Sequence, residues 1–423
     1  MKLQDYKNVH CVGIGGIGIS AIARYCHAHN ALVTGSDGCV SRITEDLQQE
    51  GILVHQGHNA AHLAAHTDLV IYSIAVPDTN PELIRARALG IMCLSYPEAL
   101  GKLTEEYTTI AVCGTHGKTT TTAMIASMFT SVGVSPTVIV GSLLTDGGTN
   151  FIQGDSEFLI VEACEYRRSF LNLHPTHVVI TNIDEDHLDY YKDLDDITSA
   201  FQSFVDKIPK NGSLITHADV TLTTVANHVR TDTIDKNLIE LSVLGDHNKS
   251  NAKLALALAR TLGFDESKAR TGLALFRGTW RRLEYKGIWH DIALYDDYGH
   301  HPNEIKATLQ ALREKYPHGV YTLYVVFQPH LFSRTKLFLD DFSHAFTDAD
   351  KICIMPIYAS REQDDETISS HDLVEKTDNA VFMESFEEIQ TYVLKRPHYH
   401  TVLVTIGAGD VYYFHNNLKN VIQ

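Results

Sequence analysis

The sequence predicts an α/β protein with more than one domain, each built on a largely parallel sheet. Short runs rich in β-branched residues alternate with amphipathic stretches along almost the whole chain, which is the pattern of βαβ units. The 423 residues also exceed what one hydrophobic core usually supports. Because 44% of the residues are hydrophobic and 21% are charged, the composition supports several cores and excludes a disordered or fibrous chain.

The N-terminal part of the chain has the pattern of a Rossmann-like domain. We expect a strand over residues 9–13, a helix over 17–28, and further strands over 32–34 and 68–76. The last of these, DLVIYSIAV, is apolar enough to be buried on both faces. Residues 101–106 are expected to form a linker to the next domain.

Two further domains follow. The second begins with the apolar strand TTIAVCG, continues through the strands FLIVEAC and THVVITNI, and contains the periodic helix NAKLALALARTLG, which ends at Gly263. The third repeats strands and helices from IALYDDY to TVLVTIGAG. These breaks predict domains over residues 1–104, 105–283 and 284–423.

Charge and cysteine content limit the classes of function. Lys and Arg number 35 against 52 for Asp and Glu, the net charge is −17, and no Lys/Arg run is present, so binding to nucleic acid or to an anionic membrane is not expected. The 7 cysteines contain no C-x-x-C pair, which indicates thiols in a reducing compartment. The N-terminal MKLQDYKNVH lacks an apolar region, and no run reaches the roughly 18 apolar residues of a membrane span. We therefore expect a cytoplasmic protein without membrane insertion.

A first glycine cluster matches G-x-G-x-x-G between a predicted strand and helix, with glycines at Gly13, Gly15, Gly16 and Gly18. Such glycines let a pyrophosphate approach a helix N-terminus, and Asp37, after Ser36 at the end of the next strand, is placed to meet a ribose hydroxyl. By itself the cluster suggests a dinucleotide such as NAD. A tight glycine turn without a ligand is the alternative.

A second glycine loop is more specific, because it follows an apolar strand, opens a helix and carries a lysine. It consists of Gly114, Thr115, His116, Gly117, Lys118, Thr119 and Thr120. Backbone N–H groups of such a loop cradle phosphates, the lysine reaches the β and γ oxygens, and the first threonine binds magnesium. The loop is shorter than a full G-x-x-x-x-G-K-[ST] motif, since residue 112 is valine. It predicts binding of a nucleoside triphosphate.

Acidic residues and a histidine follow the next two predicted strands. Glu162 and Glu165 lie at the end of FLIVEAC, where ligands of α/β sheets bind, and Glu162 can hold magnesium. His187 lies past the end of the following strand and is the expected nitrogen ligand of a second metal. The neighbouring aspartates, Asp184, Asp186 and Asp189, are interpreted for the most part as a helix N-cap with its first-turn charges.

The remaining candidates lie in loops near helix starts. Asn248 and Asn251 can read an adenine edge or cap a helix, and the sequence leaves both open. Asp297, Tyr298 and His300 form a predicted substrate loop; the His300–His301 pair lacks the third ligand of a zinc site. His330 and Arg334 follow another strand; Arg334 could clamp a carboxylate or a phosphoryl group, or be an exposed arginine at a helix start. At the second domain boundary, Arg281 or Arg282 could stabilise a transferring phosphoryl group.

These motifs, in this order, resemble the Mur ligase family, and within it the members that add L-alanine. The resemblance runs through nearly the whole chain, in GIGGIGIS, SIAVPDTNPE, GTHGKTTTT, TNIDEDHLDYY, GDHNKSNA, FRGTWRRLE, DDYGHHPNEI, VFQPHLFSRT and PIYASRE. The contexts DDYGHHP and FQPH are those of the alanine-adding members. The chain departs from the usual family residues at 164–167, at Gly299 and at Leu331.

The resemblance implies three domains: a Rossmann-like domain for the UDP substrate, a central P-loop ATPase domain and a Rossmann-like C-terminal domain. The first glycine loop would then hold a UDP pyrophosphate. ATP would phosphorylate the lactyl carboxylate of UDP-N-acetylmuramate, and the amino group of L-alanine would displace the phosphate. The implied cofactors are ATP and Mg²⁺ at two sites, where Mn²⁺ can substitute, and the expected assembly is a monomer or weak homodimer.

Residue roles are carried over from the family position by position. Lys118 matches the catalytic lysine, Thr119 and Glu162 match ligands of the first metal, and His187 matches a ligand of the second. The nucleotide contacts would be Asn248, Asn251, Arg282 and Asp297, and Arg282 would also act on the transferring phosphoryl group. The amino-acid pocket would comprise Tyr298, His300, His330 and Arg334, with His300 also a catalytic candidate.

Three alternatives remain at this stage. A related ligase could attach a preformed peptide to the same sugar nucleotide. A nicotinamide-dependent oxidoreductase would use the first glycine cluster but leaves GTHGKTT without a purpose. A non-catalytic nucleotide-gated binding protein has no need for Lys118, Glu162 and His187 together.

Overall fold

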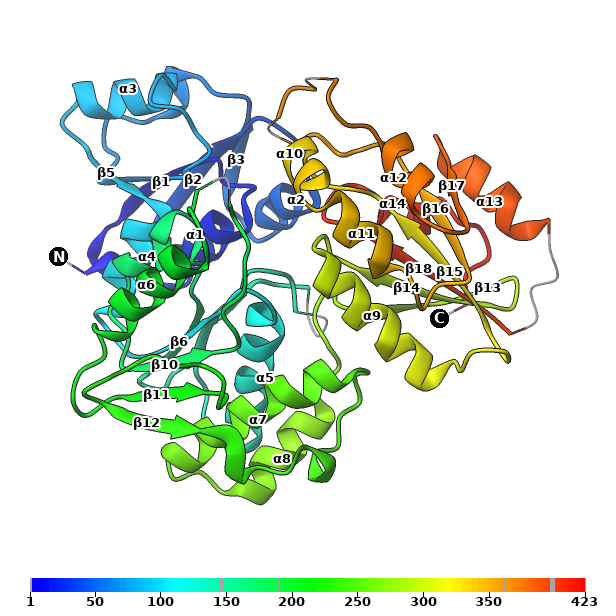
Figure 1. Cartoon of the computed structure of the whole chain (residues 1–423). Helices are drawn as coiled ribbons and strands as arrows, with labels where there is room; N and C mark the ends of the chain where they lie inside the picture. Colours follow the sequence, from blue (N-terminus) through cyan, green and yellow to red (C-terminus); the bar gives the residue numbers. More distant parts are fainter. Residues whose placement is uncertain are drawn as a thin grey trace. The chain divides into compact units, whose positions relative to one another are not determined.

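The computed structural model describes residues 2–144, 148–188, 190–360, 362–364, 366–395 and 400–422. The chain forms two compact units. The first unit comprises Met1–Leu241 and Lys249–Arg277, and the second comprises Ser242–Asn248 and Gly278–Gln423. The first unit contains two sheets and the second contains one (Figure 1).

The first sheet of the first unit has five parallel strands in the order β3-β2-β1-β4-β5. Its strands are β1 (Asn8–Val12), β2 (Leu32–Asp37), β3 (Leu53–Gln56), β4 (Leu69–Tyr72) and β5 (Met92–Ser95), and its helices are α1 (Ile17–Ala28), α2 (Arg42–Gln49), α3 (Pro81–Ala88) and α4 (Tyr96–Thr104). The strand order reverses between β1 and β4, which is the point where ligands bind in open α/β sheets. The first glycine cluster follows β1 and therefore lies at this point.

The expected linker over residues 101–106 is wrong for residues 101–104. Helix α4 continues through Thr104, and Gly101 is buried within it. A Cβ atom at Gly101 would lie 2.4 Å from the carbonyl oxygen of Asn172. The missing side chain thus allows α4 to pack closely against Asn172, which precedes β10 of the next sheet.

The second sheet of the first unit has seven strands in the order β12-β11-β10-β6-β9-β7-β8, all parallel except for the pairing of β7 with β8. Its strands are β6 (Thr108–Cys113), β7 (Thr137–Ile139), β8 (Phe151–Ile152), β9 (Phe158–Glu162), β10 (His177–Ile180), β11 (Ser213–Thr216) and β12 (Asn227–Arg230). The helices that follow are α5 (Lys118–Ser131), α6 (Leu194–Val205), α7 (Asp246–Thr261) and α8 (Glu266–Leu275). The central strand β6 and its neighbours β9 and β10 are almost wholly buried, as their apolar sequences predicted.

The second unit has a six-stranded sheet in the order β13-β14-β18-β15-β16-β17, in which only β13 is antiparallel to its neighbour. Its strands are β13 (Glu284–Trp289), β14 (Ile292–Asp297), β15 (Thr322–Phe327), β16 (Lys351–Ile354), β17 (Ala380–Phe382) and β18 (Thr401–Ile406). Helices α9 (Pro302–Lys315), α11 (Leu339–Ala345) and α12 (Ser370–Lys376) pack on one face (Figure 1). On the other face lie α13 (Phe386–Leu394) and α14 (Tyr413–Asn416), while the short α10 (Phe332–Leu337) follows β15.

The part of the chain that the structure describes also contains five 3-10 helices: η1 (Leu3–Asp5), η2 (Ala60–His62), η3 (Tyr166–Asn172), η4 (Thr231–Thr233) and η5 (Lys236–Leu238). All seven cysteines lie in the described part of the chain and are free thiols. Among the described residues, none of the helices combines the length and apolar character needed to cross a bilayer.

Three α/β sheets with parallel cores confirm the predicted fold class. The three sheets fall inside the predicted ranges, but the boundaries at 104/105 and 283/284 stay predictions. The first residues of α7 group with the second unit, although the rest of the helix belongs to the first.

The close approach at Gly101 predicts a stability effect. Gly101→Ala is expected to lower the free energy of unfolding by about 1–3 kcal/mol, because the added methyl group overlaps a backbone carbonyl. The measurement is urea unfolding followed by far-UV circular dichroism. Gly38→Ala is the matched control, since nothing lies within 4 Å of a Cβ atom there. Equal unfolding midpoints for the two variants would contradict this packing.

Candidate active site

The phosphate loop connects β6 to α5 and is held against the chain that follows β10. Gly114 has φ +135°, and a Cβ atom there would lie 2.0 Å from Oγ1 of Thr181. The backbone N–H of His116 donates to Oδ1 of Asn182 at 2.9 Å, and that of Thr115 donates to the Asn182 carbonyl at 3.1 Å. The neighbouring strand end therefore fixes the loop, and Gly114 cannot carry a side chain there.

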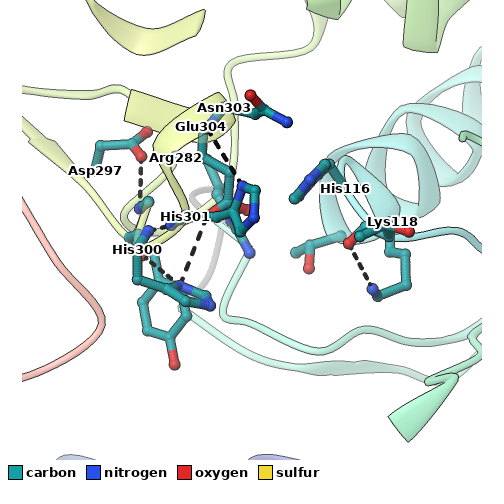
Figure 2. Close-up of polar contacts among 12 residues, drawn as sticks. His116, Lys118, Arg282, Asp297, His300, His301, Asn303 and Glu304 are labelled. Carbon is teal, nitrogen blue, oxygen red and sulfur yellow. Dashed lines mark hydrogen bonds and ion pairs between the residues drawn. The ribbon is translucent and has the colours of Figure 1, made fainter. Parts of the chain in front are cut away.

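Lys118 is the first residue of α5, and its side chain turns back to its own loop (Figure 2). Its Nζ donates to the carbonyl oxygens of Gly114 and Thr115 at 2.6 and 2.9 Å, and to Oε1 of Glu165 at 2.8 Å. Burial alone would lower the pKa of Lys118, but the Glu165 carboxylate more than offsets this and the pKa is raised. Lys118 is thus a fixed cation at the loop.

Thr119 and Glu162 come together as the sequence predicted for a metal site. The Thr119 hydroxyl donates to both carboxylate oxygens of Glu162, at 3.1 and 2.9 Å, and the Gly141 N–H donates to Oε2 at 2.8 Å. Thr120, the next residue, is buried in α5. A hydroxyl and a carboxylate beside a phosphate loop form a donor set that fits Mg²⁺, which takes few protein ligands and completes its shell with phosphate and water oxygens. The described ranges contain no group of three or more His, Cys, Asp and Glu side chains that could hold a metal ion.

His187 lies in the loop after β10, beside the phosphate-loop carboxylates. Its Nε2 is 3.7 Å from Oε1 of Glu165 and 3.9 Å from Oδ2 of Asp186, and its ring lies 4.7 Å from that of Tyr166. The interpretation of the nearby aspartates as helix-capping residues is wrong for Asp184 and Asp186. Helix α6 begins only at Leu194, and its N-cap is Asp193. Asp189 lies outside the described residues.

The first glycine loop is closed by Asp37, whose Oδ2 accepts the Gly15 N–H at 2.8 Å. A cavity of about 370 Å³ lies over the loop, lined by Gly13, Gly15, Gly16 and Asp37 among others. Gly18 has a different role, because a Cβ atom there would lie 2.5 Å from Cζ of Tyr96. Gly18 therefore allows α1 to pack on Tyr96, at the start of α4.

Ser36, predicted to bind substrate, lies behind this loop. Its side chain is fully buried, and its hydroxyl donates to Oε2 of Glu82 at 2.6 Å. The Ser36 carbonyl accepts the N–H groups of Gly13 and Ile14, so Ser36 supports the loop from beneath and its hydroxyl does not face the cavity. The structure corrects the prediction for this side chain.

Sequence reasoning missed Glu82 and His10, which together with Ser36 support the first glycine loop from beneath. Nε2 of His10 lies 3.0 Å from Oε2 of Glu82, and both side chains are fully buried. Burial alone would raise the pKa of Glu82, but hydrogen bonds from His10, Ser36 and the Asn59 backbone lower it to about 2. The segment SIAVPDTNPE contains Glu82, but nothing in its local pattern indicates burial.

A second cavity of the first unit runs from the first glycine loop to Glu162, the carboxylate that accepts from Thr119. Its volume is about 360 Å³, and its lining includes Gly16 and Ile17 of the first loop region, Tyr96, and Gly141, Glu162 and Cys164 near the phosphate loop. It shares Gly16 and Ser73 with the cavity over the first loop. A ligand held at the first glycine loop can therefore extend to the Glu162 carboxylate.

The two asparagines of GDHNKSNA lie inside a helix. Helix α7 begins at Asp246, so Asn248 and Asn251 are not its N-cap, and both are buried. Nδ2 of Asn248 donates to the Leu244 carbonyl at 2.6 Å. Asn251 lies beside the phosphate loop, since its Oδ1 would be 2.9 Å from a Cβ atom on Gly117.

In the second unit, Asp297 ends β14 and is buried. Its two carboxylate oxygens accept the N–H groups of Gly299 and Leu283, each at 2.7 Å. Burial raises the pKa of Asp297 to about 6, although Arg282 and these N–H groups act to lower it. The Arg282 guanidinium lies 5.2 Å from the Tyr298 ring and 3.8 Å from Glu304.

The predicted amino-acid pocket residues gather at the N-terminal end of α9 and near α10. Glu304 accepts the backbone N–H groups of His300 and His301, and His301 is the N-cap of α9 (Figure 2). The His300 and His330 rings are 5.9 Å apart, and Nη1 of Arg334 lies 3.4 Å from Nδ1 of His330. The sequence therefore predicted which side chains of this unit lie together.

Arg281, which sequence reasoning did not separate from Arg282, is the buried member of the pair. It forms an ion pair with Asp296 at 2.9 Å and donates to the carbonyl oxygens of Gly407 and Gly409. Its guanidinium also lies 4.5 Å from the ring of Tyr412. Arg281 thus ties the start of this unit to the loop after β18, whereas Arg282 is partly exposed.

Comparison with protein-family models gives three matches in chain order. They are "Mur ligase family, catalytic domain" over residues 8–108, "Mur ligase middle domain" over 112–235 and "Mur ligase, glutamate ligase domain" over 281–409.

The chain belongs to the Mur ligase family.

Curated Mur ligases resemble the chain over nearly its full length. The UDP-N-acetylmuramate–L-alanine ligase of Clostridium acetobutylicum is 40% identical, with 97% of both chains covered. The enzyme of the same name from Agathobacter rectalis is 39% identical, with 96% of both chains covered. Membership of this family leaves the oxidoreductase alternative without support.

Solved structures of Mur ligases share the fold. The UDP-N-acetylmuramate-alanine ligase of Thermotoga maritima superimposes with a TM-score of 0.81 at 28% identity, covering 97% of both chains. The murein peptide ligase of Psychrobacter arcticus superimposes with a TM-score of 0.70 at 22% identity, covering 99% of this chain and 100% of that one.

The raised pKa of Asp297 predicts a pH effect on stability. The folded protein binds this proton more tightly than the unfolded chain, so the contribution of Asp297 to the free energy of unfolding is present below its ordinary pKa of 3.8 and is lost as the pH rises through about 6. Each unit of pKa difference corresponds to about 1.4 kcal/mol. The wild type is therefore expected to lose stability relative to Asp297→Asn over this range.

The measurement is urea unfolding at several pH values, followed by fluorescence of Trp280 and Trp289, which both lie in the second unit. The exposed Asp291→Asn variant is the matched control. Parallel pH profiles for the wild type and Asp297→Asn would show that Asp297 does not cause the effect.

Proposed function

We propose that this chain joins L-alanine to the lactyl carboxylate of UDP-N-acetylmuramate in an ATP-dependent reaction of cytoplasmic peptidoglycan precursor synthesis. The observation that carries the proposal is the cavity that connects the first glycine loop to Glu162 at the phosphate loop, in a chain of this family. A sugar nucleotide held at one loop and phosphorylated at the other requires this connection. The relatives named for this activity, at about 40% identity over nearly the full chain, support the choice of substrates.

The UDP pyrophosphate is assigned to the first glycine loop. The free N–H groups and the dipole at the N-terminus of α1 favour an anion there. Gly13, Gly15, Gly16 and Asp37 line the cavity over the loop, which supports their assignment as substrate contacts. The lactyl carboxylate would then extend toward Glu162.

The nucleotide is assigned to the second loop. The loop N–H groups and Lys118 would bind the phosphates of ATP, and Thr119 with Glu162 would hold a first Mg²⁺ ion, with His187 at a second position. Mg²⁺, when bound, offsets the negative charge shared by the carboxylate and the triphosphate. Asn248, Asn251, Arg282 and Asp297 are proposed contacts of the nucleotide.

The chemistry proceeds in two steps. A carboxylate oxygen of the lactyl group attacks the γ-phosphorus of ATP, ADP leaves, and an acyl phosphate forms. The alanine amino nitrogen then attacks the acyl carbon, the tetrahedral intermediate releases inorganic phosphate, and the nitrogen loses a proton to give the amide. Activation is needed because a free carboxylate is a poor acylating agent. Lys118 stabilises the charge on the transferring phosphoryl group.

The second unit is assigned to the amino acid. Tyr298, His300, His330 and Arg334 lie together there, and the Arg334 guanidinium suits the alanine carboxylate. A preformed peptide is the alternative acceptor. The fold of a murein peptide ligase is similar, but at 22% identity this likeness concerns the fold alone.

The test is phosphate release from ATP in the presence of UDP-N-acetylmuramate and one acceptor at a time: L-alanine, glycine, L-serine, or an alanyl-glutamyl-diamino acid tripeptide. We expect release to require the sugar nucleotide and to be fastest with L-alanine. Lys118→Ala is expected to lower kcat by about 10²–10³-fold or more, since it removes a charge that acts on the transition state.

Lys210→Ala is the matched control, because Lys210 is exposed and lies between α6 and β11, outside the loops of the site. If only the tripeptide supports turnover, the acceptor is a preformed peptide and the proposed L-alanine is wrong. Absence of turnover with every acceptor would contradict the proposed ligation.

A further inference from the structure

The lysine of the phosphate loop is fully occupied by the protein itself. Its Nζ donates to the carbonyl oxygens of Gly114 and Thr115 and to Oε1 of Glu165, at 2.6, 2.9 and 2.8 Å. An ammonium group has three N–H donors, so these contacts use all of them. Lys118 can therefore bind a phosphate oxygen only if it gives up one of these partners.

Glu165 is the partner that competes most strongly with a phosphate. The two carbonyl groups are neutral, whereas Glu165 contributes a full negative charge. Its side chain is only 3% exposed, so water screens its attraction for the ammonium group weakly. A carboxylate and a phosphate thus compete for the same cation at the same loop.

The position of Glu165 is fixed by its backbone. The Tyr191 hydroxyl donates to the Glu165 carbonyl at 2.5 Å, and the N–H of Arg168 donates to the same oxygen at 2.8 Å. Two residues earlier, the N–H of Ala163 donates to the Val112 carbonyl of β6 at 2.8 Å. Glu165 therefore cannot follow Lys118 freely when the lysine moves toward a phosphate.

The second carboxylate oxygen of Glu165 adds an independent observation. Oε2 is buried and has no hydrogen-bond partner among the residues that the structure describes. A buried carboxylate with one oxygen already unpaired holds Lys118 more firmly, because Lys118 donates a hydrogen bond to it at 2.8 Å, whereas Nε2 of His187 lies 3.7 Å away.

We propose that Glu165 is a positioning residue that holds Lys118 at the loop and limits nucleotide affinity by competing with phosphate for the lysine. This inference rests on the assignment of Lys118 to phosphate binding in the proposed function. It gives a role to Glu165, for which the sequence analysis predicted a position near Glu162 but no function.

Removal of the Glu165 charge has opposite effects on binding and turnover. Glu165→Gln keeps the size of the side chain and an acceptor oxygen but releases Lys118 for phosphate. We expect ADP to bind about tenfold more tightly in the absence of divalent cations. We expect kcat for ligation to fall without a rise in the KM for ATP, because the lysine is no longer held in place. A purely structural role would weaken binding and turnover together.

The experiment measures the Kd of ADP by isothermal titration calorimetry with the full-length protein in EDTA. Glu157→Gln is the matched control, since Glu157 is an exposed glutamate directly before β9, the strand that Glu165 follows. A double-mutant cycle adds Lys118→Ala, in which Glu165→Gln is expected to leave the Kd of ADP unchanged. The cycle thereby shows whether the effect of Glu165 passes through Lys118.

The second variant is Glu165→Asp, which keeps the negative charge but shortens the side chain by one methylene group. We expect a smaller gain in ADP affinity than with Glu165→Gln. Unchanged or weaker ADP binding in the folded variants, an equal gain in the Lys118→Ala background, or failure of both variants to fold would overturn the inference. These outcomes differ from failure of the proposed function. Loss of ligation in the wild type contradicts the proposed reaction, yet leaves the ADP comparison intact.

Discussion

The contact of the phosphate loop with the end of β10 is the constraint on which the site depends. Gly114 passes so close to Thr181 that no side chain fits, and Asn182 binds the loop backbone at Thr115 and His116. This contact fixes the loop carbonyls that hold Lys118. Because β9 and β10 flank β6 on either side, the same sheet edge also brings Glu162 and His187 to the loop.

The proposed reaction requires two anions to bind close together despite their mutual repulsion. A carboxylate substrate and a triphosphate repel each other, and the chain itself carries a net charge of −17. Attraction must therefore come from local groups: two helix N-termini preceded by glycine loops, the half-buried Lys118, and the oxygen atoms of Thr119 and Glu162, which suit Mg²⁺. The cavity that runs from the first glycine loop to Glu162 would let these groups act on one substrate.

Features set by local sequence were predictable. The helix over residues 17–28 matches α1 residue for residue, and the phosphate loop lies between a buried strand and a helix, because glycine spacing and apolar periodicity act over a few residues. The meeting of Thr119 with Glu162 followed from the rule that parallel strands end at one edge.

Features set by tertiary packing were not predictable. Gly101 looked like part of a linker, but it is buried because Asn172 packs against it from a distant part of the chain. Ser36 was expected to contact the substrate, but it donates to Glu82, whose burial depends on α3 lying beside the sheet. Arg281 and Arg282 are adjacent, but only Arg281 is buried, because it binds Asp296 and the carbonyl groups of Gly407 and Gly409. In each case the deciding partner lies far away in sequence.

The most direct test of the account follows the carboxylate oxygens of the substrate. UDP-N-acetylmuramate labelled with oxygen-18 in its lactyl carboxylate is incubated with ATP and L-alanine, and the released inorganic phosphate is analysed by mass spectrometry. If the carboxylate is phosphorylated at the loop before the amine attacks, each phosphate carries one oxygen from the carboxylate. Inorganic phosphate without the label, formed together with the amide product, would contradict the account.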